Sequence, residues 1–140
     1  MTMTLTLTND QIQKLSQAIT SLDGGHVVQI IDGRPVSVWR GYKLAHAARW
    51  SLALAQGTLQ SAVAAFNRAH DSLLGTHSGG EGRLSPSDPR FPRFAEALNE
   101  LRLQPVELDL PALKLADLNP AENEFPIHVL TALQPLIQTE

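Results

Sequence analysis

The densest group of side chains able to bind an anion lies between positions 39 and 50. It combines aromatic rings with basic groups: Trp39, Arg40, Tyr42, Lys43, His46, Arg49 and Trp50. Aromatic faces can stack on nucleobases, while arginine and lysine hold phosphates. If this segment is helical, Tyr42, His46 and Arg49 share one face. The pattern predicts a site for a nucleotide-like anion. The alternative is that the tryptophans are core residues and the charges form a solvated face.

A second candidate anion site is the glycine-rich segment HSGGEGR at positions 77–83. Glycine lets backbone N–H groups approach a phosphate closely, and Arg83 adds a positive charge beside them. The segment is no Walker motif, because it lacks a lysine followed by serine or threonine and no strand precedes it. We therefore keep Arg83 as a candidate ligand-binding residue, with a flexible linker as the alternative reading of the segment.

Side chains suited to metal binding or catalysis are present, but not in recognised spacings. One set near an expected helix end matches no established ligand pattern: His70, Asp71, His77 and Glu81. Two carboxylate pairs fit exposed surfaces: Glu96 with Glu100, and Glu107 with Asp109. No serine stands in a nucleophile elbow, and no histidine has an obvious orienting partner. We expect no metal, no cofactor and no enzymatic activity.

Length and composition narrow the class of protein. We expect one domain over the 140 residues, with a flexible loop at about residues 75–92. The net charge of −3 disfavours duplex nucleic acid as a partner. The absence of cysteine excludes disulfides and thiolate zinc sites. No run of about 18 apolar residues is present and the first residues do not form a signal peptide, so we expect a cytoplasmic protein with no membrane partner.

The first forty residues predict a strand, a helix and a hairpin. Residues 1–7 alternate apolar residues with threonine, which is typical of a half-buried strand. Asn9 then suits a helix N-cap before an apolar stripe over residues 12–22. Two β-rich runs, 26–31 and 34–39, flank a dipeptide preferred in type I′ turns, Asp32-Gly33. The implied register pairs position 31 with position 34, and Pro35 places the second run at a sheet edge.

Residues 42–74 form one long helical pattern rich in alanine and leucine, with Gly57 as a candidate bend. Its continuous apolar stripe contains Leu44, Ala48, Ala55, Leu59, Ala62, Phe66 and Leu73. Such a helix would extend roughly 50 Å at 1.5 Å per residue. Because a helix of this length commonly packs against a second copy, we expect a homo-oligomer formed through it.

Shorter elements complete the chain. A short helix begins near residue 94, a strand covers residues 106–110, and a last helix is marked by Ile127, Leu130 and Leu133. Pro135 should end or kink that helix. Because helices and strands are grouped rather than strictly alternating, the predicted fold class is α+β: helix-rich, with a β-hairpin and short strands packed with one long helix.

Three stretches of the second half share a recognisable layout: ELDL at 107–110, LKLADL at 113–118 and LTALQPLI at 130–137. Before them the long helix closes on FNRAHDSLL at 66–74, and a variable loop follows. Over about residues 40–140 this layout resembles short uncharacterised proteins of tailed bacteriophages, whose chains end in an "elDl…LePlI" tail. Gln134 stands where an acidic residue is usual. The resemblance implies a phage origin and action in the host cell cytoplasm, and it transfers no catalytic residue.

The resemblance and the basic cluster together lead to three hypotheses. The first is a non-enzymatic homo-oligomer that binds and sequesters a small anionic nucleotide-like signalling ligand, or a host factor, to counter host defence. The second is a virion-assembly or tail-associated structural protein. The third is an enzyme that cleaves a nucleotide signal. Basic side chains converging on a pocket would favour the first hypothesis, and large apolar surface patches would favour the second.

Overall fold

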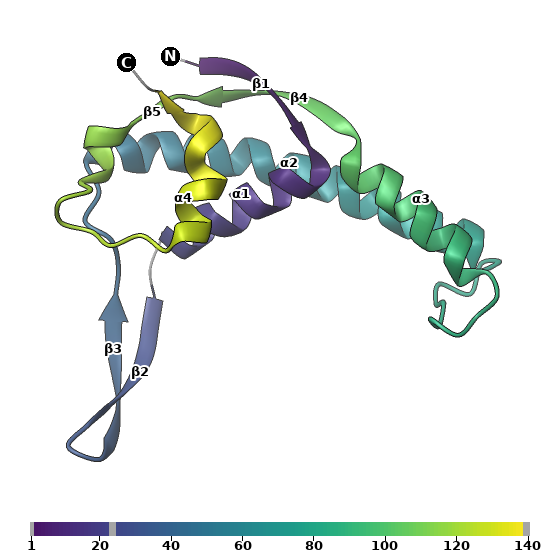
Figure 1. Cartoon of the computed structure of the whole chain (residues 1–140), viewed down its shortest axis with the longest axis horizontal. Coiled ribbons are helices and arrows are strands. Elements are labelled where there is room, and N and C mark those ends of the chain that lie inside the picture. The colour runs from purple at the N-terminus through teal and green to yellow at the C-terminus, as the bar shows by residue number, and fades with distance from the viewer. Residues whose placement is uncertain (1, 23–24, 139–140) are drawn as a thin grey trace.

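The chain folds as an α+β protein around one long helix, α2 (His46–His77). The structure, a computed structural model, describes residues 2–22 and 25–138. The other elements are, in chain order, β1 (Thr2–Thr8), α1 (Asn9–Leu22), β2 (Gly25–Ile31), β3 (Arg34–Arg40), α3 (Phe91–Leu103), β4 (Pro105–Pro111), β5 (Leu113–Lys114), the 3-10 turn η1 (Leu115–Leu118), α4 (Ile127–Leu133), the 3-10 turn η2 (Gln134–Leu136) and β6 (Ile137–Gln138). This order and class confirm the sequence prediction (Figure 1).

One cluster of buried side chains joins α1, α2, α4 and β4. Helix α1 packs on α2, α4 packs on α1 and runs across it, the ribbon of β1 and β4 runs above them, and α3 packs on the far end of α2 (Figure 1). The most deeply buried residues of the cluster are aliphatic: Ile12, Leu15, Ala55, Leu59, Leu110, Val129, Leu133 and Leu136. The core therefore sits between the inner face of α2 and the two shorter helices.

The predicted N-terminal strand is confirmed from residue 2 onward, and Met1 lies outside the described residues. In β1 Thr2, Thr4 and Thr6 are exposed, while Leu7 is buried and Leu5 is half-buried. Strand β1 pairs antiparallel with β4, with Leu7 opposite Val106. The hydroxyl of Thr4 donates a hydrogen bond of 2.7 Å to Asp109 Oδ1 on the exposed face.

The predicted cap of α1 is wrong by one residue. Thr8, not Asn9, caps the helix: the Gln11 N–H donates to the Thr8 hydroxyl at 3.2 Å, and the Thr8 N–H donates to Gln11 Oε1 at 2.9 Å. This reciprocal pair is a capping box. Asn9 is instead buried and donates a hydrogen bond of 2.8 Å from Nδ2 to the Leu101 carbonyl, because the end of α3 lies against it.

The long helix begins four residues later than predicted, and it continues through Gly57 to His77. Residues 41–45 are not helical, because the backbone N–H and carbonyl of Lys43 are both bonded to the side chain of Asn123. Tyr42 and Lys43 therefore do not share helix faces with His46 and Arg49, as the sequence pattern predicted. The loop is also shorter than predicted, since residues 75–77 are helical.

The predicted apolar stripe of α2 is buried inside the protein's own core. Ala48, Ala55, Leu59 and Phe66 are all buried, and Leu59 has no exposed surface. Helices α1 and α3 and strand β4 cover this face. The stripe is therefore not available to a second copy, and an oligomer formed through this helix needs its opposite face.

The predicted hairpin is confirmed together with its register. Ile31 pairs with Arg34, and Asp32 and Gly33 both have positive φ, of 51° and 74°, as a type I′ turn requires. Strands β2 and β3 pair only with each other among the described strands. They form an arm that leaves the body of the protein and projects away from it (Figure 1).

The last helix is where predicted, but its buried face differs. Val129 and Leu133 are buried, while Ile127 is 82% exposed and Leu130 is exposed. The predicted stripe of Ile127, Leu130 and Leu133 is therefore right only at Leu133: α4 packs on α1, and its buried residues are Val129 and Leu133. No helix of the described residues is both long enough and apolar enough to cross a bilayer.

We expect Leu59→Ala to lower the free energy of unfolding by about 2–5 kcal/mol, because it leaves a cavity at a fully buried position. Gln60→Ala, at the neighbouring exposed position, should change it by less than about 0.5 kcal/mol. Urea titrations followed by circular dichroism measure both values. Equal effects of the two substitutions would contradict this placement of the core.

Candidate functional site

The segment before α2 is fixed by the loop that precedes α4. Asn123 Oδ1 accepts a hydrogen bond from the Lys43 N–H at 2.9 Å, and Asn123 Nδ2 donates to the Lys43 carbonyl at 2.9 Å. Asn119 Nδ2 donates to the same carbonyl at 2.7 Å. Tyr42 stacks on Phe125 with ring centroids 5.0 Å apart. These contacts set where α2 begins, and therefore where the predicted basic side chains lie.

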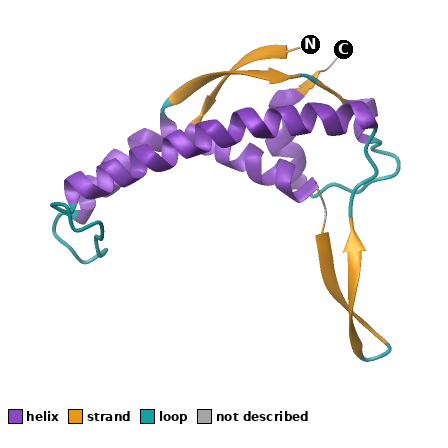
Figure 2. Cartoon of the chain, turned by 180° about the vertical axis from the view of Figure 1, so that it is seen from behind, coloured by secondary structure: helices purple, strands orange, loops and turns teal. Residues whose placement is uncertain are grey.

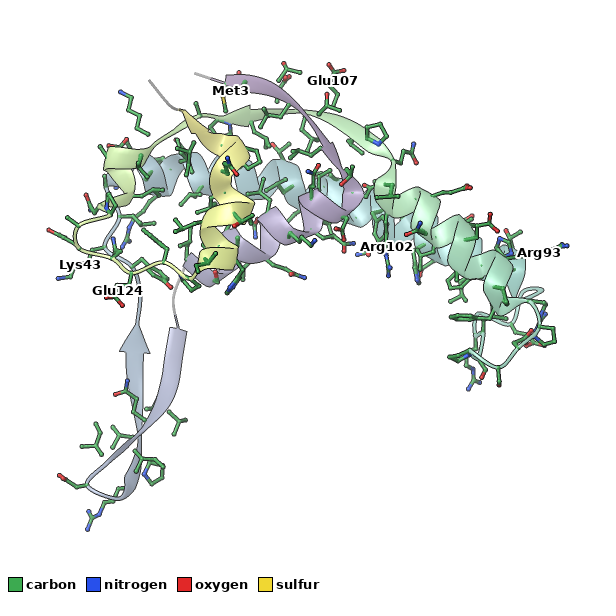
Figure 3. The ribbon with its side chains drawn as sticks, in the orientation of Figure 1. Met3, Lys43, Arg93, Arg102, Glu107 and Glu124 are labelled. Carbon is green, nitrogen blue, oxygen red and sulfur yellow. The ribbon has the colours of Figure 1, made fainter. Side chains whose placement is uncertain are left out.

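The basic side chains at the start of α2 are exposed. Lys43 lies at the outer edge of the molecule (Figure 3), and the Arg49 guanidinium donates a long hydrogen bond of 3.4 Å from Nη2 to the Tyr42 carbonyl. His46 meets the ring of Trp50 edge to face at 6.3 Å, and Trp50 is 61% exposed, so it is no core residue. Lys43 and Arg49 can attract an anion. The ring of Tyr42, which the sequence suggested for stacking on a base, is already stacked on Phe125.

The remaining predicted residues stand apart from this group. The side chains of Trp39 and Arg40 lie outside the described part of the chain. Arg49 lies in the first turn of α2 and Arg83 follows the other end, so most of a helix of 32 residues, about 48 Å long at 1.5 Å per residue, separates them. Arg83 and Arg49 therefore cannot hold the same small ligand within one chain.

An aromatic cluster fills the end of α2 where α3 begins. The ring centroid of Phe94 lies 5.9 Å from that of His70, 6.2 Å from that of His77 and 6.0 Å from that of Phe91. The two histidines considered as metal ligands thus pack against Phe94. Within the described ranges, no group of three histidine or carboxylate side chains is placed to hold a metal ion.

Two open grooves lie at this same end of the molecule. One, of about 530 Å³, is bordered by Arg83, His70 and Phe94. The other, of about 730 Å³, runs between α2 and α3 and is lined mainly by apolar residues, among them Leu73 and Leu101. Neither groove includes the basic residues at the start of α2, so the predicted anion cluster does not line either of them.

The glycine loop after α2 folds back on its own helix. The Gly80 N–H donates to the Gly75 carbonyl at 2.9 Å, and the Gly82 N–H donates to the hydroxyl of buried Ser78 at 3.0 Å. Gly79, Gly80 and Gly82 have positive φ, which glycine allows without strain. The amides of Gly80 and Gly82 therefore have acceptors inside the loop. The mobility of this loop stays a prediction.

An ion pair precedes α3. Arg90 donates to Asp88 from Nη2 at 2.9 Å, from Nε at 3.1 Å and from its backbone N–H at 2.8 Å. These hydrogen bonds lower the pKa of Asp88 from 3.8 to about 2, and they raise the pKa of Arg90. The pair fixes the turn that leads into α3.

Sequence reasoning missed the exposure of the hairpin arm. Val28 is 72% exposed and Ile30 is 78% exposed on one face, and Ile31 and Val36 are exposed on the other. Figure 3 shows side chains of the arm standing in open space away from the body. A signal was present in the sequence, because β2 has apolar residues on both faces and no charged residue.

The chain matches no known family, and neither a curated protein nor a solved structure is significantly similar to it. The assignment of function therefore depends on the geometry described above.

Two substitutions distinguish structural from exposed residues around the start of α2. Asn123→Ala should lower the free energy of unfolding by about 1–3 kcal/mol, because it leaves the backbone groups of Lys43 without partners. Arg49→Ala should change it by less than about 0.5 kcal/mol, because the guanidinium is exposed. Chemical denaturation measures both. A larger loss in Arg49→Ala would make that residue structural and remove it from the binding hypothesis.

The Asp88–Arg90 pair predicts a shifted titration. Because the folded pKa of Asp88 is lowered, its contribution to stability is present above its ordinary pKa of 3.8 and is lost as the pH falls toward about 2. An NMR titration of the Asp88 carboxyl carbon should give a midpoint near pH 2. In Arg90→Gln the midpoint should return toward 3.8. An unshifted Asp88 in the unmodified protein would contradict the pairing.

Proposed function

We propose that the protein is a non-enzymatic assembly protein that joins neighbouring copies of itself through the β2–β3 arm. The observation that carries the proposal is the exposure of Val28 and Ile30 on an arm that no described element covers. An isolated two-stranded hairpin is marginally stable in water. Each square ångström of apolar surface that a neighbour covers contributes about 25 cal/mol. An arm of this kind gains stability by pairing.

The backbone of the arm favours pairing along β2. In a hairpin with a two-residue turn, the pair flanking the turn exchanges hydrogen bonds, and every second pair points its N–H and carbonyl groups outward. Ile31 and Arg34 flank the turn, so positions 28 and 30 of β2 point outward, as do Pro35 and Ser37 of β3. Pro35 has no N–H, which leaves β3 a poor edge for pairing. The edge of β2 has neither proline nor charge to protect it.

The chemistry of β2 suits a second copy of the same strand. Two β2 strands can pair antiparallel about a two-fold axis at Val28, so that position 26 of each lies opposite Ile30 of the other. No charged side chain of β2 opposes this approach, and main-chain hydrogen bonds provide affinity in strand addition generally. The result is a four-stranded sheet with the two β3 strands outside.

This proposal belongs with the second hypothesis from the sequence, an assembly or tail-associated protein acting in the host cell cytoplasm. It is favoured over sequestration of a nucleotide-like ligand because the basic residues at the start of α2 line neither groove. Apolar surface on a projecting arm is the feature expected of an assembly protein. The phage origin is supported only by the resemblance in the C-terminal half of the sequence.

A matched pair of proline substitutions tests the arm. Val28 and Ser37 are partners across the hairpin and both point their N–H groups outward, Val28 on the open edge and Ser37 on the edge that Pro35 already blocks. Val28→Pro should weaken self-association by about 10- to 100-fold, because each copy loses an edge hydrogen bond worth about 0.5–1.5 kcal/mol. Ser37→Pro should leave association unchanged.

Sedimentation equilibrium measures the association constants of both variants. Circular dichroism and the urea midpoint confirm that each variant stays folded. Equal association of Val28→Pro and the unmodified protein would exclude self-pairing through β2. In that case binding of the arm to a different protein would have to be considered.

A further inference from the structure

The outer face of α2 is apolar and uncovered along its middle. Trp50 is 61% exposed and Leu54 is 62% exposed on this face, and Gly57, Ser61 and Ala64 continue it at alternating spacings of three and four residues. Figure 2, which views the protein from behind, shows α2 in front with no element laid over this face. The spacing is the one by which two helices pack side by side.

This face carries no charge over a long stretch. Residues 50–67 contain no Asp, Glu, Lys or Arg, and the stretch is bounded by Arg49 and Arg68. The solvent-facing side of a helix in a monomeric protein usually carries charged and polar residues. Here the inner face is buried in the core while the outer face is also apolar, which is typical of a helix with a second packing partner.

Gly57 has no explanation within one copy. A glycine inside a helix costs about 1 kcal/mol relative to alanine. A Cβ atom at Gly57 would meet nothing within 4 Å, so the fold of a single chain does not require glycine there. Close approach of another helix does require it, because a side chain at the crossing point would hold the two backbones apart.

The face is complementary to itself in the antiparallel orientation. Its N-terminal half is bulky, with Trp50 and Leu54, and its C-terminal half is small, with Ser61 and Ala64. An antiparallel pair centred on Gly57 places Trp50 of one copy opposite Ala64 of the other, and Leu54 near Ser61. A parallel pair would instead place the two Trp50 side chains against each other and leave the small residues without contacts.

One pair of opposite charges and the helix dipoles agree with this orientation. The same register brings Asp71, whose side chain is 80% exposed, to the start of α2 in the second copy, where Lys43 is exposed. Antiparallel helices also place their opposite dipole ends side by side. The same register also brings Arg49 of one copy near Arg68 of the other, so the shape of the face and the helix dipoles, rather than the sum of the side-chain charges, favour the antiparallel arrangement.

We infer that the outer face of α2 binds a second copy of this chain in an antiparallel pair centred on Gly57. This interface is distinct from the arm and does not depend on it. It uses the helix that the sequence predicted for oligomer formation, but the face opposite to the predicted stripe. Where both contacts form, each copy has two neighbours.

Gly57→Leu tests the close approach. The substitution has open space in the single chain, so the fold should be retained, while two opposed leucines block the crossing. We expect the dissociation constant of this pair to rise by about 30-fold or more. Gly75→Leu is the matched control, because Gly75 lies in the same helix with open space around its Cβ position but outside the overlap. Sedimentation equilibrium in the Val28→Pro background isolates this contact from the arm.

Spin labels test the orientation. The chain has no cysteine, so single substitutions give single labels. In the antiparallel pair, labels at Ser72→Cys lie roughly 45 Å apart along the axis, and labels at Asn67→Cys, an exposed position outside the packed face, lie roughly 30 Å apart. A parallel pair gives the same short separation at both positions, and double electron–electron resonance measures the separations. Short distances at both positions, or unchanged association in Gly57→Leu, would overturn the inference.

Failure of this inference is separable from failure of the arm proposal. If only Val28→Pro weakens association, the arm stands and the α2 pair is excluded. If only Gly57→Leu weakens it, the α2 pair stands and the arm proposal is excluded. If each single variant still associates while the double variant, Val28→Pro with Gly57→Leu, is monomeric, both contacts are supported.

Discussion

Burial of the inner face of α2 is the constraint on which the other elements depend. Ala55 and Leu59 have no exposed surface, and α1, α4 and β4 are all held in the cluster that these residues complete. The groups at the start of α2 depend on the same packing. The loop before α4 carries Asn123, and Asn123 fixes the backbone of Lys43 just before the helix begins. With its inner face used in this way, the chain leaves the outer face of α2 and the β2–β3 arm uncovered.

The parts of the fold that the sequence predicted are those with local causes. The type I′ turn at Asp32 and Gly33 sets the hairpin register within a few residues, so the register was predictable. The pairing of β1 with β4 joins positions such as Thr4 and Asp109, more than one hundred residues apart, and alternation alone does not name the partner. The start of α2 was misplaced for the same reason, since the group that stops the helix at Lys43 is Asn123, eighty residues away.

The candidate site shows a similar limit. The sequence identified the residue types that bind anions, but not whether those side chains would converge. Tyr42 was read as a stacking platform, and its ring is stacked on Phe125, far along the chain. Val28 and Ile30 are exposed because no described element covers the arm. A local sequence pattern does not determine whether another element will cover it. The uncharged stretch of residues 50–67 was visible in the sequence, and its meaning required knowing which face of α2 the core uses.

The two proposed contacts have a joint consequence for symmetry. Each is isologous, with its own two-fold axis, one near Val28 and one near Gly57. The arm projects away from the body while the outer face of α2 runs along it (Figure 2), so the two axes lie at different places on the molecule. Two different isologous contacts on one chain do not close at a dimer, and they extend either into a string or into a ring. The seven residues of β2 extend about 23 Å and the uncharged stretch of α2 about 27 Å, so a dimer formed through α2 uses a contact of similar length to the contact at the arm. The arms of such a dimer then remain free to join it to the next.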